Sequence, residues 1–202
     1  MKVVRTTLLL ALLNAAAITN KLAGAEADVE SHIDETDADV YCVCETWCKA
    51  GEPGHRLGKL LRLTDRFAYQ RDRDDGRAGG GVAAIYKHDA PMTPRPDLNS
   101  GEEGVAFELH RRQLPNLVVF VFYLPPDALP RYRANLKLAE KSIEAARAEG
   151  KHVVILGDLN GRHEELAGTG TSDRGKALRA MTKRQRLTCM NPFGVPTSKR
   201  GH

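Results

Sequence analysis

Short apolar runs recur along the chain, and each is bounded by polar, glycine-rich or proline-rich sequence. A run of about four to eight apolar or alternating residues between such breaks is typical of a β-strand. Strands are therefore predicted over Thr6–Leu13, Asp39–Cys44, Gly80–Tyr86, Val105–Leu109, Leu117–Leu124 and Val153–Leu156.

Three other segments place apolar residues three or four positions apart, which is the spacing of one face of an α-helix. They are Lys21–Thr36, about Tyr132–Glu149, and Asp173–Arg186. Gly150 follows the second segment, as glycine often does at a helix end because it accepts the left-handed conformation. The inner face of this helix is predicted to be Leu136, Ala139, Ile143 and Ala146.

The order of these elements limits the fold class. A strand and a helix come first, several strands follow in succession, and a helix, a strand and a helix come last. Strands that follow one another without helices between them tend to pair in antiparallel or mixed sheets. We therefore expect a layered α+β fold and not a doubly wound parallel sheet.

Length and composition agree with one domain over residues 1–202. A chain of 202 residues can bury a substantial core, and its charged content of 28% is that of an ordinary globular protein. The net charge of +4 is mildly basic, which suits a polyanionic partner without requiring one.

The four cysteines do not match a metal-binding pattern. They are Cys42, Cys44, Cys48 and Cys189. The spacing C-x-C-x3-C lacks the second pair, or the suitably spaced histidines, of a zinc knuckle. Cys42 and Cys44 lie in an apolar run, where thiols behave as small hydrophobic groups, so we expect reduced cysteines.

Polar side chains stand at or near the ends of four predicted strands. They are Asn14, Glu45, Tyr123, and the pair Asp158 and Asn160. Taken singly they are ordinary, since an asparagine can cap a helix, a tyrosine can pack in a core, and Asp-x-Asn is a turn signal. Taken together, they offer oxygen ligands for a hard cation such as Mg²⁺ and donors for a phosphate oxygen.

The last of these strand ends carries two polar groups next to a glycine. In an extended chain, residues two apart point to the same side, so Asp158 and Asn160 can face one target. Gly157 has no side chain and therefore lets a backbone or a ligand approach closely.

Five motifs, in order along nearly the whole chain, carry a family resemblance. They are LLNAAAITNK, ADVYCVCETW, RAGGGVAAIYK, VVFVFYLPP, and VILGDLNGRHEEL with DRGKALRAM and LTCMN after it; PTSKRGH follows them. This set resembles the endonuclease/exonuclease/phosphatase superfamily, which has the DNase I-like fold. It looks most like the endonuclease domain of non-LTR retrotransposons.

The resemblance implies a four-layer α/β/β/α sandwich with mixed, largely antiparallel sheets. It implies that Glu45 ligates Mg²⁺ or Mn²⁺ with Asn14 beside it. Tyr123 and Asn160 would bind the scissile phosphate, and Asp158 would orient or deprotonate the attacking water. Phosphodiester cleavage builds charge on non-bridging oxygens, which a metal and neutral donors stabilise. Among the arginines, Arg131 is a candidate contact to DNA phosphates.

The family completes its site with an aspartate and a terminal Asp-His pair, on strands beyond the Pro-Thr segment. This chain reaches His202 before those strands, and His202 does not match the family's histidine. The resemblance therefore implies a fold that is incomplete at the C-terminus and a site that lacks groups.

The function implied is Mg²⁺-dependent phosphodiester hydrolysis, as the DNA-nicking endonuclease of a non-LTR retroelement. DNA is the expected partner, a reverse transcriptase domain would follow in the full-length protein, and neither a membrane nor an obligate protein partner is expected. Residues 1–25 have the outline of a secretory signal, with Lys2, Arg5 and an apolar stretch. Removing them would also remove Asn14, so we expect an intracellular or nuclear location.

Two alternatives stay open. One is a non-catalytic retroelement relic that at most binds nucleic acid. The other is a different metal-dependent phosphoesterase, such as a phosphoinositide phosphatase or a sphingomyelinase. A calcineurin-like metallophosphatase, which GDLNGRHE superficially resembles, would also need an Asp-x-His on the first strand, and none is present there.

Overall fold

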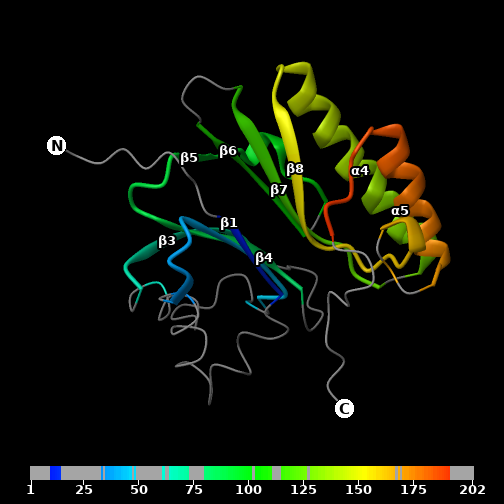
Figure 1. Cartoon of the computed structure of the whole chain (residues 1–202), viewed down its shortest axis with the longest axis horizontal. Coiled ribbons are helices and arrows are strands. Elements are labelled where there is room, and N and C mark those ends of the chain that lie inside the picture. Colours follow the sequence, from blue (N-terminus) through cyan, green and yellow to red (C-terminus); the bar gives the residue numbers. More distant parts are fainter. Residues whose placement is uncertain are drawn as a thin grey trace, which may run out of the picture.

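Two four-stranded β-sheets organise the part of the chain that the structure describes (Figure 1). This computed structural model describes residues 10–14, 33, 35–46, 48, 61, 64–72, 80–101, 103–110, 115–126, 128–166, 168 and 170–191. The parts of the predictions for Thr6–Leu13 and Lys21–Thr36 that fall on residues 6–9, 21–32 and 34 lie outside these ranges.

The first sheet contains β1 (Leu10–Asn14), β2 (Val40–Cys44), β3 (Arg66–Arg71) and β4 (Val82–Lys87), in the spatial order β1-β2-β4-β3. β1 runs parallel to β2, and the other pairs are antiparallel. Every residue of β2 is buried, which agrees with its continuous apolar sequence.

The second sheet contains β5 (Met92–Pro94), β6 (Gly104–Leu109), β7 (Leu117–Tyr123) and β8 (His152–Asp158), in that spatial order. β7 and β8 are parallel, and the other pairs are antiparallel. β7 is buried on both faces. Val119 and Val121 pack against the first sheet, whereas Phe120 and Phe122 pack under the helices.

Helices α4 (Leu129–Ala148) and α5 (Asp173–Arg184) cover the outer face of the second sheet (Figure 1). The short 3₁₀ helices η1 (Pro96–Leu98) and η2 (Glu164–Leu166) lie in the connecting segments. The predicted inner face of α4 is confirmed, and Tyr132 belongs to it as well. α4 begins three residues earlier than expected because Pro130 is compatible with the first turn of a helix.

The outer face of the first sheet is also covered. Ile33 and Leu61, both in helical conformation, pack in a cluster with Tyr41, Val43 and Ile85. Among the described residues, the two sheets therefore face each other across an apolar core, with α4 and α5 on the outer face of the second sheet. This is the layered α+β architecture that the sequence predicts.

Two edge strands were not predicted from the sequence. β3 has the polar sequence RFAYQR and is mostly half-exposed, and β5 has three residues, one of them a proline. Edge strands have one hydrogen-bonded neighbour and partial exposure, so they need no continuous apolar run and tolerate proline.

The described residues contain four free thiols, Cys42, Cys44, Cys48 and Cys189. No helix within the described ranges is long and apolar enough to cross a membrane.

Candidate active site

Two predicted site residues stand at one end of the first sheet. In the parallel pairing of β1 with β2, Asn14 lies opposite Cys44, and Glu45 follows Cys44 directly. Glu45 is half-buried and adopts a left-handed backbone conformation, with φ of 58°. Such a conformation is uncommon outside glycine and costs about 1 kcal/mol or more, so the surrounding structure must hold it in place.

Two more predicted residues stand at one end of the second sheet. In the parallel pairing of β7 with β8, Tyr123 lies opposite Asp158. The pairing continues past the strands, since the Leu124 amide donates to the Asp158 carbonyl at 2.9 Å. The Asp158 side chain is therefore carried on a rigid, hydrogen-bonded strand end.

Gly157 allows β8 to approach β7 just before Asp158. Its φ is 137°, and a Cβ added there would overlap the carbonyl oxygen of Phe122. The prediction that Gly157 admits a close approach is confirmed, and the group that approaches is the backbone of the neighbouring strand.

The two sheet ends meet at the thiol of Cys44. Its Sγ donates to the Phe122 carbonyl at 3.5 Å, which links β2 to β7. Burial raises the pKa of the Cys44 thiol to about 12; a backbone hydrogen bond from Asp158 lowers it, and the charges of Asp158 and Glu45 raise it. Glu45 and Asp158 therefore belong to different sheets whose ends are joined through Cys44: Glu45 follows Cys44 in sequence, and Asp158 follows Gly157, which lies opposite Phe122.

The local geometry of Asp158 and Asn160 differs from the extended pair expected from the sequence. β8 ends at Asp158, and Asn160 has a left-handed φ of 45°. The Asn160 amide donates to Asp158 Oδ1 at 3.1 Å, which closes an Asx turn. The expectation of an extended chain was wrong here because the side chain of Asp158 folds the backbone back onto itself.

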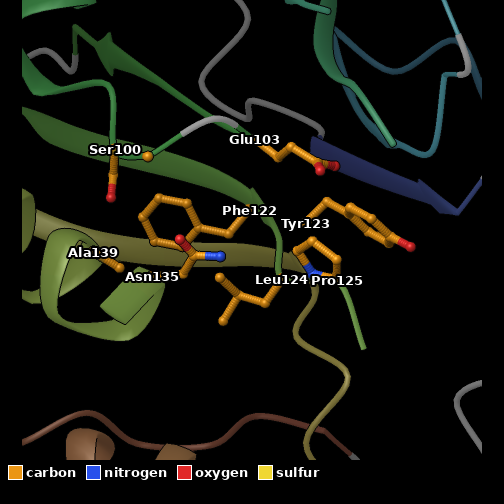
Figure 2. A pocket seen from close by; sticks show the side chains of 9 residues that line it. Ser100, Glu103, Phe122, Tyr123, Leu124, Pro125, Asn135 and Ala139 are labelled. Atoms are coloured by element: carbon orange, nitrogen blue, oxygen red, sulfur yellow. The ribbon is translucent and has the colours of Figure 1, made fainter. Parts of the chain in front are cut away.

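Tyr123 is largely buried, with 8% of its surface exposed, and it packs in the core between the sheets. Figure 2 shows its ring on the opposite side of β7 from the ring of Phe122, as alternation along a strand requires. Its predicted contact with a phosphate stays a prediction.

Helix α4 contributes two neighbouring residues with different positions. Arg131 is exposed in the first turn, where a phosphate can reach it. Tyr132 is buried, and its hydroxyl donates to the Leu159 carbonyl at 2.7 Å. Burial raises the pKa of Tyr132, the charge of Arg174 lowers it, and that of Asp158 raises it.

Arg174 is a cation near the candidate site that the sequence analysis did not single out. It lies in the first turn of α5, which begins after Ser172; the Ser172 hydroxyl accepts from the Gly175 amide at 3.0 Å. A Cβ on Gly175 would overlap the Arg162 carbonyl, so the Arg-Gly sequence lets α5 pack on the loop after Asn160. The motif DRGKALRAM is visible in the sequence, but its contact with that loop is a tertiary feature.

The arrangement fits a hard divalent cation. The described residues contain no group of three or more His, Cys, Asp or Glu that could hold a metal ion alone. Glu45 and Asp158 offer two carboxylates at the adjoining ends of the two sheets. Mg²⁺ is commonly held by one or two carboxylates, with substrate phosphate and water supplying the remaining oxygens.

Comparison with known proteins identifies the family. Residues 13–202 match the model of the Endonuclease/Exonuclease/phosphatase family. The chain belongs to this family. No curated protein matches the sequence of the chain.

Solved structures with the same fold include nucleases and a phosphatase. The endonuclease domain of TRAS1, a telomere-specific non-LTR retrotransposon, has a TM-score of 0.68 at 18% identity, over 94% of this chain and 77% of that chain. The AP endonuclease LMAP from Leishmania major has a TM-score of 0.70 at 12% identity, over 91% and 71%. ANGEL2, a 2',3'-cyclic phosphatase, has a TM-score of 0.57 at 18% identity, over 78% and 54%.

At these identities the structural likeness shows the fold alone. The family resemblance and the fold class drawn from the sequence are confirmed. The protein is thus a member of the Endonuclease/Exonuclease/phosphatase family whose candidate site lies where the ends of its two sheets meet.

Proposed function

We propose that the protein is a divalent-metal-dependent phosphodiesterase that nicks DNA, as the endonuclease domain of a non-LTR retroelement. The observation that carries the proposal is the junction of the two sheet ends: Glu45 follows Cys44, whose thiol donates to the Phe122 carbonyl at 3.5 Å, and Tyr123, next to Phe122, lies opposite Asp158. Carboxylates at two adjoining strand ends suit a hard cation and an attacking water better than they suit a purely structural junction.

The chain's own residues take the following roles. Glu45 and Asn14 hold Mg²⁺ or Mn²⁺. Asp158 accepts a proton of the water that attacks phosphorus, while the bond between phosphorus and the leaving sugar oxygen breaks and that oxygen takes up a proton from solvent. Asn160 and Tyr123 donate to the non-bridging oxygens, where negative charge grows in the transition state. When bound, the metal supplies a positive charge that polarises a phosphate oxygen.

DNA binding requires contacts on either side of the cleaved bond. Arg131 is exposed on the first turn of α4, and Arg174 precedes Gly175, which packs on the loop after Asn160. Contacts of arginine with phosphates fix the position of a duplex without reading its sequence. We assign Arg131 to this role. The assignment to a retroelement rests on the motif resemblance and on the fold shared with TRAS1.

The decisive experiment is cleavage of supercoiled plasmid DNA. With Mg²⁺ or Mn²⁺ present, the purified chain should convert supercoiled plasmid to the nicked circle, and a chelator should stop the reaction. Binding of DNA without any nicking would favour the non-catalytic relic. Cleavage of a small phosphodiester or a cyclic phosphate, with the plasmid intact, would favour another phosphoesterase of the family.

Glu45→Gln tests the metal ligand. The substitution keeps the size of the side chain and removes its charge, so Mg²⁺-stimulated nicking should fall by about 100-fold or more. Asp65→Asn is the matched control, because Asp65 is an exposed carboxylate at the opposite end of the same sheet. Unchanged nicking by Glu45→Gln would refute the role given to Glu45.

A further inference from the structure

A buried acid lies beside the candidate site and belongs to none of the motifs. Glu103 immediately precedes β6 and exposes 5% of its surface. A carboxylate is costly to remove from water unless hydrogen bonds or charges compensate it. The contacts of Glu103 therefore indicate what compensates its burial and which segments it joins.

Glu103 touches both sheets. Its carboxylate Oε2 accepts from the Gly81 amide at 3.2 Å, just before β4 of the first sheet. Its backbone carbonyl accepts from the Tyr123 amide at 3.0 Å, at the end of β7 of the second sheet. Figure 2 shows the Glu103 carboxylate on the side of β7 where the Tyr123 ring lies.

Gly81 also contacts the segment that contains Glu45. Its carbonyl accepts from the Thr46 amide at 3.3 Å, and Thr46 directly follows Glu45. Gly81 has a left-handed φ of 81°, and a Cβ there would overlap the Thr46 hydroxyl. The fully buried Thr46 is thus packed tightly against the residue that Glu103 holds.

Glu103 also contacts the second sheet, which carries Tyr123 and Asp158. The Tyr123 amide donates to the Glu103 carbonyl, and Tyr123 lies opposite Asp158 in the β7–β8 register. One route of hydrogen bonds therefore runs from the Glu45 side, through Thr46 and Gly81, to Glu103, and from there to Tyr123.

We propose that Glu103 is a positioning residue, whose carboxylate fixes the Gly81–Thr46 segment and so sets where Glu45 lies relative to Tyr123 and Asp158. This inference rests on the proposed function, because it concerns the geometry of the same site. Misplacement of a reacting group by about 1 Å can lower a rate by about 100-fold, so a contact of this kind affects turnover.

A second buried acid, Glu108 of β6, provides the comparison. Glu108 exposes 7% of its surface at the other end of β6. Its carboxylate accepts from Lys151 and Asn116 and pairs with Arg95 at 3.1 Å. Glu108 thus belongs to a charge network remote from the candidate site, so its loss should lower stability without changing turnover.

The experiment compares Glu103→Gln, Glu103→Ala and Glu108→Ala. Gln keeps a carbonyl oxygen that can accept from Gly81, so Glu103→Gln should keep kcat within about threefold. Ala removes the acceptor, so Glu103→Ala should lower kcat by about 10- to 100-fold with little change in KM. Glu108→Ala should keep the kcat of the folded fraction. If Glu103→Ala does not fold, Glu103→Asp, with its acceptor one methylene short, replaces it with the same expected direction.

Amide hydrogen exchange gives a readout that does not depend on cleavage. In Glu103→Ala, exchange should accelerate at Gly81 and also at Thr46, whereas Glu103→Gln should restore protection at both. Equal loss of kcat in Glu103→Gln and Glu103→Ala would overturn the inference, since charge and not position would then matter. Faster exchange confined to Gly81 would also overturn it. If the wild-type chain does not cleave DNA, the proposed function fails, and the exchange data alone decide on Glu103.

Discussion

At the scale of single residues, a substitution can separate the observed role of Asp158 in a turn from its proposed role in catalysis. Its Oδ1 accepts from the Asn160 amide, which closes the turn, and the carboxylate is assigned to the attacking water. Asn at this position keeps an oxygen for the turn but is a far weaker base. Asp158→Asn should therefore lower turnover by about 100-fold or more and leave DNA affinity within about threefold.

Plasmid nicking and fluorescence anisotropy of a labelled duplex measure these two quantities. Asp65→Asn again serves as the control for a lost surface charge. A loss of DNA affinity as large as the loss of turnover would indicate that Asp158 shapes the loop and does not act on water.

The buried thiol of Cys44 makes the free energy of unfolding depend on pH. Burial raises the pKa of its thiol from 9.0 to about 12. Above pH 9 the unfolded chain loses this proton while the folded chain keeps it. The thiol's contribution to stability is therefore complete below pH 9 and declines as the pH rises toward 12, by on the order of 1 kcal/mol per pH unit.

Urea unfolding between pH 8 and pH 11 tests this dependence. The free energy of unfolding of wild type should fall more steeply with pH than that of Cys44→Ala. Cys189→Ala is the matched control for removing a thiol that is only partly buried. Parallel slopes for wild type and Cys44→Ala would contradict the assignment.

At the scale of elements, the β7–β8 pair depends on one glycine. Gly157→Ala would place a methyl group against the Phe122 carbonyl and disturb the register that brings Tyr123 opposite Asp158. We expect a loss of about 2–4 kcal/mol in the free energy of unfolding, together with a loss of nicking.

Gly170→Ala separates the clash from the backbone conformation. Gly170 also has a left-handed φ, of 77°, but open space surrounds the position of its Cβ. Its substitution should cost about 1 kcal/mol in urea unfolding. Equal costs for the two glycines would mean that the approach of β8 to β7 is not constrained as described.

At the scale of the whole molecule, one apolar core lies between the sheets and another lies under the helices. Both include residues of β7, so the described layers should unfold together. Ile143→Ala, on the inner face of α4, should lower the free energy of unfolding by about 2–4 kcal/mol and shift a single transition. The kcat of the folded fraction should not change, because Ile143 lies about three helical turns from Tyr132.

Urea unfolding followed by circular dichroism measures the stability, and plasmid nicking at equal folded fraction measures kcat. Two separate unfolding transitions in Ile143→Ala would show that the helical layer and the inter-sheet core are independent units.

The elements that the sequence predicts well are those whose environment is recorded in the local pattern. β2 and β7 are buried on both faces and read as continuous apolar runs, and α4 shows its buried face at helical spacing. β3 and β5 were missed because an edge strand leaves half of its surface and one side of its backbone unconstrained.

The sequence by itself determined which polar groups end the strands, because a buried strand must change from apolar to polar residues where it leaves the core. It also determined the family, since the motifs occur in order along the chain. Only the tertiary structure decided that the sheet ends of Glu45 and Asp158 are joined through Cys44, that Asn160 lies in a turn, and that Glu103 joins the two sheets. Those contacts depend on strand register and sheet packing, which join residues far apart in the sequence and leave no local pattern.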